Sequence, residues 1–125
     1  MEIKTKKILI IDDDSRNIFA LTAVLKAKKY TCLSATSAQQ GFEILENDQN
    51  VAVVLMDMMM PDMDGYEAMK KMKSHELLKD IPVIAVTAQA MVGDRERCLQ
   101  AGAVGYISKP VNVDELVEQL NNYIN

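Results

Sequence analysis

Short, continuous apolar runs are the sequence feature that most constrains the fold of this chain. The runs 7–11, 51–56 and 82–86 are rich in aliphatic and β-branched side chains, and they lack the apolar–polar alternation of a strand with one face in water. Runs of this kind are typical of strands that are buried on both faces, as in a parallel sheet. The sequence therefore predicts a parallel sheet that is covered by helices on both sides.

Segments with helical periodicity separate these runs. Two shorter strands are expected at 31–35 and 104–107, and helices are expected at 15–29, from the cap Ser37 to about Asn47, at 66–74, at 94–101 and after the cap Asn112. Ser15 is the expected cap of the first helix. The regular alternation of five strands with five helices, joined by right-handed crossovers, predicts an α/β doubly wound fold.

Length and charge narrow the possible partners. The chain has 125 residues, and we expect one domain over 1–125. Its 14 Lys and Arg residues against 18 Asp and Glu residues give a net charge of −4, and no basic cluster favours direct binding of nucleic acid. No apolar run approaches the roughly 18 residues of a membrane span, and no signal peptide is evident. We therefore expect a cytoplasmic protein without membrane insertion, whose partner is a protein or a cation.

The scarcity of histidine disfavours several kinds of site. His75 is the only histidine, so a Ser–His or Cys–His nucleophile, or a zinc site with several histidines, would depend on this one side chain. The two cysteines, Cys32 and Cys98, lie far apart in the sequence and form no metal-binding pair motif. Chemistry based on carboxylates is favoured instead.

Four of the five predicted strands are followed by polar residues. In a doubly wound sheet the carboxyl ends of the strands share one edge, and ligands bind there, beside the point where the strand order changes. The following side chains are expected to gather at that edge: Asp12, Asp13 and Asp14 after the first strand, Asp57 after the third, Thr87 after the fourth and Lys109 after the fifth. For Asp14 the preferred interpretation is an acid at the N-terminus of the first helix, where the helix dipole favours it.

Carboxylates gathered at one edge repel one another. At a separation of ~5 Å and an effective dielectric constant of ~20, each ionised pair costs about 3 kcal/mol. A bound cation, a lysine or protonation of one acid must offset this repulsion. Because the expected ligands are oxygen atoms with no histidine or cysteine nearby, Mg²⁺, or Mn²⁺, is favoured over zinc, and Mg²⁺ sites commonly include phosphate oxygens.

Asp57 directly follows the most apolar run of the chain. An acid in this place is costly unless it has a function, and carboxylates can attack phosphoryl groups to form acyl phosphates. In such a reaction a metal ion would neutralise phosphoryl oxygens, Lys109 would pair with another oxygen, and Thr87 would donate a hydroxyl hydrogen bond. We interpret Asp57 as a nucleophile rather than as a residue that only ends a strand.

Four motifs together resemble the receiver domain of two-component response regulators, over essentially the whole chain. They are Ile10-Ile11-Asp12-Asp13-Asp14, the segment 55–65, Val86-Thr87-Ala88 and Tyr106-Ile107-Ser108-Lys109-Pro110. The resemblance implies a flavodoxin-like (βα)5 fold, a three-layer sandwich whose parallel five-stranded sheet has the order 2-1-3-4-5. The segment 87–95 is similar to receivers that stand alone in a phosphorelay or are attached to hybrid sensor kinases.

The same resemblance implies a phosphorylation site and a metal site. Asp57 would be the phosphoacceptor, and Asp12 and Asp13 would form an acidic pair that binds Mg²⁺. Asp13 would contact the ion directly and Asp12 largely through water. Asp57 and the backbone carbonyl of Met59 would be further metal ligands.

A switch and a set of partners are also implied. Thr87 and Lys109 would contact the phosphoryl group, and the Lys109–Pro110 bond would be cis. On phosphorylation Thr87 would move toward the phosphoryl oxygens, and Tyr106 would rotate into the space that it leaves. The phosphoryl donor would be a phosphohistidine of a histidine kinase or a histidine phosphotransfer protein. A downstream protein would bind the face formed by the fourth helix, the fifth strand and the fifth helix.

Three other functions fit the sequence less well. A Mg²⁺-dependent phosphatase that forms an aspartyl phosphate would use the same nucleophile, but dehalogenase-type hydrolases place a second aspartate two positions later, where this chain has Met59. A flavin-binding module is disfavoured because the acids 12–14 would repel its phosphate. A degenerate receiver would act only as an interaction module, yet Asp13, Asp57, Thr87 and Lys109 are intact. We therefore predict a signalling phosphoacceptor that catalyses only its own phosphorylation and slow dephosphorylation, and not an enzyme with metabolic turnover.

Overall fold

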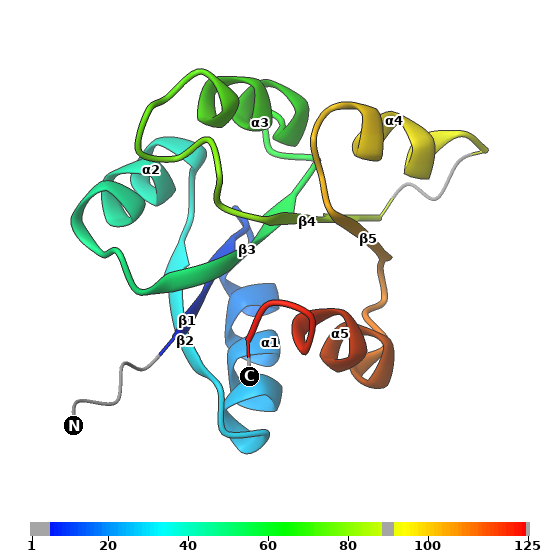
Figure 1. Ribbon diagram of the computed structural model, residues 1–125. Helices are drawn as coiled ribbons and strands as arrows, with labels where there is room; N and C mark the ends of the chain where they lie inside the picture. The colour runs from blue at the N-terminus through cyan, green and yellow to red at the C-terminus, as the bar shows by residue number, and fades with distance from the viewer. Residues whose placement is uncertain (1–5, 89–91, 125) are drawn as a thin grey trace.

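The computed structural model describes residues 6–88 and 92–124, in which five strands and five helices alternate along the chain (Figure 1). The strands are β1 (Lys7–Ile11), β2 (Thr31–Ala35), β3 (Val51–Asp57), β4 (Val83–Thr87) and β5 (Gly105–Ser108). The helices are α1 (Ser15–Ala27), α2 (Ala38–Asn47), α3 (Gly65–Lys73), α4 (Asp94–Gln100) and α5 (Val113–Leu120). The predicted alternation of strands and helices is confirmed.

The five strands form one parallel sheet of order β2-β1-β3-β4-β5. β3 is the central strand, and its Met56 pairs with Ile11 of β1 on one side and with Ala85 of β4 on the other. The direction in which the chain adds strands reverses between β1 and β3, so the carboxyl ends of these two strands flank the topological switch point. The predicted doubly wound, flavodoxin-like fold is confirmed.

Successive strand residues point to opposite faces of the sheet and belong to two separate cores. Ile8 and Ile10 pack with residues of α1 and α5, including Leu25, whereas Leu9 and Ile11 pack with residues of α2, α3 and α4. Figure 1 shows one layer of helices on each face of the sheet, with α1 and α5 on one face and α2, α3 and α4 on the other. This burial on both faces explains why the strands are continuous apolar runs. Within the described residues, no helix has the length and apolar character that crossing a membrane requires.

The predicted ends of the strands and helices differ from the observed ends by at most a few residues, but the cap of α1 differs in identity. Asp14 is the cap, because its carboxylate accepts a hydrogen bond of 2.9 Å from the backbone N–H of Arg16, and Ser15 is already helical. Asp14 has the extended backbone of a cap residue, and its carboxylate also interacts favourably with the positive end of the helix dipole. The prediction of Ser15 as the cap is therefore wrong, whereas the caps Ser37 and Asn112 are confirmed.

Replacement of two leucines tests the core that the structure assigns to α1. Leu25 is fully buried and is the one buried residue of α1, whereas Leu77 is 64% exposed. We expect Leu25→Ala to lower the free energy of unfolding by about 2–5 kcal/mol because it leaves a cavity. Leu77→Ala, the matched control, should change it by less than about 0.5 kcal/mol. Urea denaturation followed by circular dichroism measures both values, and equal losses in the two variants would contradict the assignment.

Candidate functional site

Three carboxylates lie together at the carboxyl edge of the sheet. Asp12 follows β1 and Asp57 ends β3, and because these strands are neighbours in register the two residues lie side by side. Carboxylate oxygens of Asp12, Asp13 and Asp57 all lie within 4.8 Å of one another. Asp12 and Asp57 are buried, and Asp13 is exposed. Asp14 is not part of this cluster; it caps α1, which confirms its preferred interpretation as an acid at the helix N-terminus.

Backbone groups hold one oxygen of each buried acid. Oδ1 of Asp12 accepts a hydrogen bond from the N–H of Asp14 at 2.9 Å, and Oδ1 of Asp57 accepts one from the N–H of Met59 at 3.0 Å. In each case the donor lies two residues after the acid, at the first turn of the loop that follows the strand. These contacts fix the orientation of both carboxylates and leave their Oδ2 atoms facing the site.

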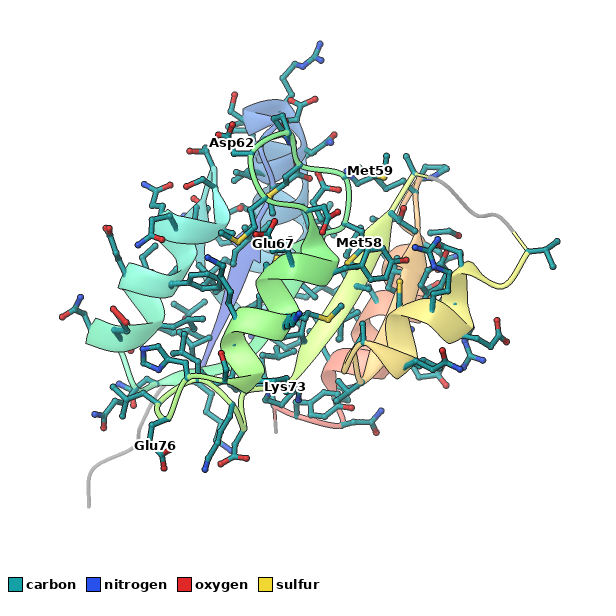
Figure 2. The ribbon with its side chains drawn as sticks, turned by 90° about the horizontal axis from the view of Figure 1, so that it is seen from above. Met58, Met59, Asp62, Glu67, Lys73 and Glu76 are labelled. Atoms are coloured by element: carbon teal, nitrogen blue, oxygen red, sulfur yellow. The ribbon has the colours of Figure 1, made fainter. Side chains whose placement is uncertain are left out.

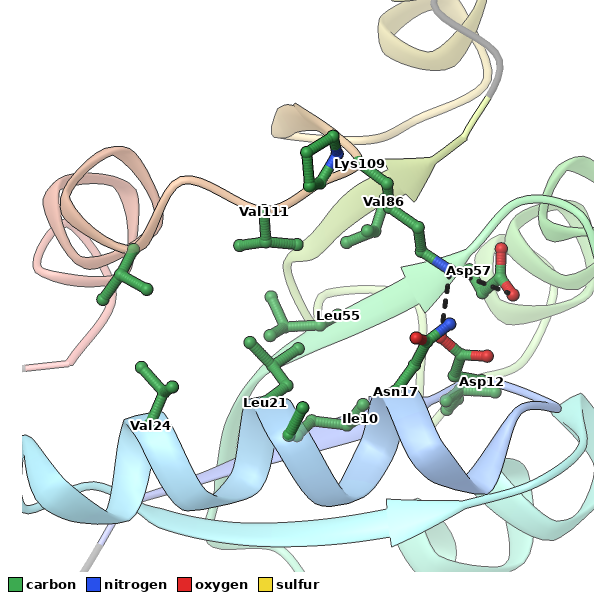
Figure 3. A pocket seen from close by; sticks show the side chains of 14 residues that line it. Ile10, Asp12, Asn17, Leu21, Val24, Leu55, Asp57, Val86, Lys109 and Val111 are labelled. Carbon is green, nitrogen blue, oxygen red and sulfur yellow. Dashed lines mark hydrogen bonds and ion pairs between the residues drawn. The ribbon is translucent and has the colours of Figure 1, made fainter.

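Lys109 supplies the positive charge between the two buried acids. Its Nζ lies 3.2 Å from Oδ2 of Asp12 and 3.8 Å from Oδ2 of Asp57 (Figure 3). The lysine follows β5, where its N–H donates a 2.8 Å hydrogen bond to the carbonyl of Thr87 and its bond to Pro110 is cis, as expected. The structure therefore brings Lys109 to the acids although it is far from both in the sequence.

The charge of the site is not balanced by Lys109. One ammonium group faces three carboxylates, so ionised acids leave two negative charges uncompensated. The pKa of Asp57 is raised to about 6: burial is the largest cause and the neighbouring Asp12 also raises it, whereas the N–H of Met59 and the ammonium of Lys109 act in the opposite direction. A cluster of oxygen ligands with this residual charge suits a hard divalent cation such as Mg²⁺.

Thr87 reaches the same edge of the sheet, but Tyr106 does not. Thr87 ends β4, is 2% exposed, and follows Val86, the partner of Asp57 in the β3–β4 register. Together with Asp13 and Met59 it borders a cavity of about 590 Å³. Tyr106 lies earlier in β5, and its hydroxyl donates a 2.8 Å hydrogen bond to Oδ2 of Asp94 in α4.

The loop between β3 and α3 places neighbouring methionines in different environments. Met58 is 2% exposed and Met59 is 50% exposed, and Figure 2 shows both residues near the start of α3. A side chain at Gly65 would collide with Sδ of Met58, so the loop can return to the helix in this way only with glycine at that position. The sequence motif that ends in Gly65 therefore reflects a packing requirement as well as the chemistry of Asp57.

An apolar cleft beside the acids was not predicted. It has a volume of about 530 Å³ and extends from Asp12 and Asp57 along α1 toward the segment after β5 (Figure 3). Asn17, Leu21 and Val24 contribute to it from one face of α1. Their spacing of four and three residues is the signal in the sequence that would have identified this face.

Comparisons with known proteins agree on one family. The family model described as the response regulator receiver domain matches residues 8–121. The polar-differentiation response regulator DivK of Brucella ovis is 36% identical over 120 residues, which cover 96% of this chain and 97% of that protein.

Solved structures share the fold. The receiver domain of the sensor histidine kinase PA1611 from Pseudomonas aeruginosa PAO1, solved with a magnesium ion coordinated in its active-site cleft, has a TM-score of 0.84 and 33% identity. That comparison covers 94% of this chain and 96% of the other. A chain of the co-crystal structure of the histidine phosphotransfer protein Ypd1 and the receiver domain of Ssk1, both from Saccharomyces cerevisiae, has a TM-score of 0.81. At 22% identity, over 98% of this chain and 91% of the other, this likeness shows the fold alone.

The raised pKa of Asp57 predicts a pH dependence in solutions kept free of metal with EDTA. The folded protein retains a proton that the unfolded chain releases from about pH 4, so this stabilising contribution is present at low pH and is lost as the pH rises through about 6. Relative to wild type, Asp57→Asn should gain up to about 3 kcal/mol in the free energy of unfolding between pH 4 and pH 7. Urea denaturation across this range measures the difference.

The exposed Asp62 provides the control for loss of one negative charge. Asp62→Asn should follow the wild-type pH curve. Parallel curves for wild type and Asp57→Asn would show that Asp57 does not have the raised pKa.

Proposed function

The chain belongs to the response regulator receiver domain family of two-component signalling, and from this membership we propose that it is a phosphorylation-dependent switch whose phosphoacceptor is Asp57. We extend the proposal to the whole chain, with 1–125 as one receiver domain. The observation that carries it is the position of the buried Asp57 carboxylate, with Asp12 and Asp13 on one side and the ammonium group of Lys109 3.8 Å away.

In the proposed reaction an oxygen of the Asp57 carboxylate attacks the phosphorus atom of the donor. The bond between phosphorus and the donor atom breaks, its electron pair stays with the donor, and Asp57 becomes an acyl phosphate. Lys109 would pair with one phosphoryl oxygen, and the hydroxyl of Thr87 would donate a hydrogen bond to another. Water would later hydrolyse the acyl phosphate slowly, so the protein would catalyse only reactions of its own side chain.

The acidic cluster supports a role for Mg²⁺, with Mn²⁺ as a substitute. Asp13 would bind the ion directly and Asp12 largely through water, and Asp57 and the backbone carbonyl of Met59 would complete the protein ligands. When bound, the ion would neutralise charge on the phosphoryl oxygens. Support comes from the all-oxygen donor set and from the two negative charges that Lys109 leaves uncompensated. The magnesium ion in the PA1611 receiver is consistent with this assignment.

The phosphoryl donor must come from another protein if it is a histidine. His75 is the only histidine of the chain, and it lies between the end of α3 and the start of β4, at the edge of the sheet opposite Asp57. Its Nε2 lies 2.9 Å from a carboxylate oxygen of Glu46, far from the acidic cluster. We propose a histidine kinase or a histidine phosphotransfer protein of the cytoplasm as the donor. The structure of Ypd1 with the Ssk1 receiver provides an example of such a pair.

The output of the switch would be a change of surface rather than a product. Thr87 would move toward the phosphoryl oxygens, and Tyr106 would rotate toward the space beside Thr87. Because Tyr106 lies in β5 and contacts α4, this movement would alter the face formed by α4, β5 and α5. We propose that a downstream protein, rather than nucleic acid, binds this face.

The phosphatase alternative receives no support from the residues near Asp57. The position two residues after the nucleophile holds Met59, whose side chain is 50% exposed and cannot act as an acid or a base. A degenerate receiver would lack a functional phosphoacceptor. It would therefore gain no phosphoryl group in a direct test of phosphorylation, whereas the proposed switch would gain one.

Incubation with acetyl phosphate and Mg²⁺, followed by intact mass spectrometry, tests the central proposal. We expect the wild-type protein to gain one phosphoryl group, because Asp57 is positioned as a nucleophile beside Lys109. Asp57→Asn should gain none, and EDTA should suppress the gain in the wild type. No gain in the wild type, or an equal gain in Asp57→Asn, would refute the proposed function.

Replacement of Thr87 separates phosphorylation from the response to it. We expect Thr87→Ala to be phosphorylated, but to show a much smaller change in the backbone amide NMR signals of α4 and β5. A hydrogen bond to a charged phosphoryl group contributes roughly 1.5–3 kcal/mol, so its loss should shift the equilibrium between the two states by about 10- to 150-fold.

Ser108, the exposed hydroxyl residue paired with Thr87 in β5, supplies the matched control for this experiment. Ser108→Ala should respond like the wild type. A full response in Thr87→Ala would exclude Thr87 from the switch.

A further inference from the structure

The carboxylate of Asp94 receives hydrogen bonds from two tyrosines that belong to different elements. The hydroxyl of Tyr66 in α3 donates to Oδ1 at 3.0 Å, and the hydroxyl of Tyr106 in β5 donates to Oδ2 at 2.8 Å. Asp94 itself is the first residue of α4. One carboxylate thus connects α3, α4 and β5.

The start of α4 depends strongly on these contacts. The cap position is Gly93, at φ 86°, which has no side chain that could cap the helix. α4 has seven residues, and Cys98 is its one buried residue. A helix this short is marginal without tertiary contacts, so the two hydrogen bonds of Asp94 are a substantial part of what holds its first turn in place.

The two tyrosines are attached to α4 in different ways. Tyr66 contacts three residues of the helix: besides Asp94, its hydroxyl lies 3.5 Å from Sγ of Cys98, and the guanidinium carbon of Arg97 lies 4.8 Å from the centre of its ring. In the described part of the chain, the hydroxyl of Tyr106 has one hydrogen-bond partner, Asp94. Movement of the Tyr106 hydroxyl away from α4 therefore breaks one hydrogen bond, whereas movement of the Tyr66 side chain would break three polar or ring contacts.

Space is available on the inner side of Asp94. The cavity of about 590 Å³ that Thr87 borders is also bordered by Tyr66 and Asp94. Tyr106 borders a different pocket, of about 310 Å³, together with residues of α5 such as Gln119. The observed position of the Tyr106 ring is therefore outside the cavity next to Thr87, and Asp94 lies at the boundary of that cavity.

We propose that Asp94 restrains Tyr106 in the unphosphorylated state. The hydrogen bond to Tyr106 exists in that state and is broken when Tyr106 rotates, whereas Tyr66 keeps Asp94 and α4 attached to α3 in both states. This inference rests on the proposed function and adds the residue that opposes the switch. An interaction made only in the unphosphorylated state lowers the affinity for any ligand that favours the other state.

The affinity for beryllofluoride in the presence of Mg²⁺ measures this opposition, because beryllofluoride mimics a phosphoryl group on a carboxylate. Asp94→Ala and Tyr106→Phe each remove the proposed restraint, and we expect each to bind beryllofluoride about 10-fold more tightly than the wild type, as loss of one charge-assisted hydrogen bond implies. NMR titration of the α4 and β5 amides provides the dissociation constants.

Tyr66→Phe is the matched control, because it also removes one hydroxyl from Asp94 but leaves the bond to Tyr106. It should bind beryllofluoride no more tightly than the wild type. The double variant Asp94→Ala/Tyr106→Phe should bind no more tightly than the tighter single variant, since both changes break the same hydrogen bond. A general loosening of the fold would instead make Tyr66→Phe bind more tightly too.

Failure of the proposed restraint and failure of the proposed function give different results in these experiments. Unchanged or weaker binding by Tyr106→Phe, or tighter binding by Tyr66→Phe equal to that of Tyr106→Phe, would overturn the role of Asp94, and this holds even if Asp94→Ala does not fold. Failure of the wild type to bind beryllofluoride and to be phosphorylated would overturn the proposed function, and the restraint with it. Normal binding by the wild type with no gain in the variants would overturn the restraint alone.

Discussion

Two acids buried side by side at the ends of neighbouring strands, Asp12 and Asp57, are the constraint on which the rest of the structure depends. Their repulsion would oppose folding if no cation reached them. The cation comes from Lys109, 97 residues after Asp12, so the site is complete only when β5 has joined the sheet beyond β4. The hydrogen bond from the N–H of Lys109 to the carbonyl of Thr87 attaches the lysine to the end of β4. The partial compensation of the negative charge at the site therefore depends on the order of the strands in the sheet.

The two cores make this arrangement rigid. Ile11 and Met56, which directly precede Asp12 and Asp57, are fully buried and pack into the core under α2, α3 and α4. Ile10 and Leu55, one residue earlier, pack into the core under α1 and α5. Asp12 thus directly follows a strand that is packed on both faces, and Asp57 is the last residue of another such strand. Rigid strands with functional loops at their ends are the general arrangement of sites in such sheets.

The sequence was sufficient to predict where the residues at the ends of strands lie, but it was not sufficient to predict contacts that involve the position of a helix. Asp12, Asp57, Thr87 and Lys109 were brought together correctly because apolar runs locate strand ends, and parallel strand ends share one edge. The cap of α1 was misassigned because Ser15 and its neighbour Asp14 are both good caps, and only the backbone conformation decides between them. The cluster of Tyr66, Asp94 and Tyr106 could not be found, because it depends on where α4 lies relative to α3 and β5, and local periodicity does not specify that position.

Burial of Asp57 has opposite consequences for the resting protein and for the proposed acyl phosphate. In the resting protein, burial disfavours the ionised carboxylate, and its pKa is raised to about 6. In the acyl phosphate this oxygen would carry a covalent bond, and the negative charge would move outward to the phosphoryl oxygens, toward Lys109, Thr87 and the exposed Asp13. Phosphorylation would therefore remove the negative charge of the buried Asp57 carboxylate and place a larger negative charge on the phosphoryl oxygens, outside the carboxyl edge of the sheet. The driving force for a conformational change would arise among the loops and the end of β4, next to the cavity bordered by Thr87 and Asp94, and the two cores could remain as they are.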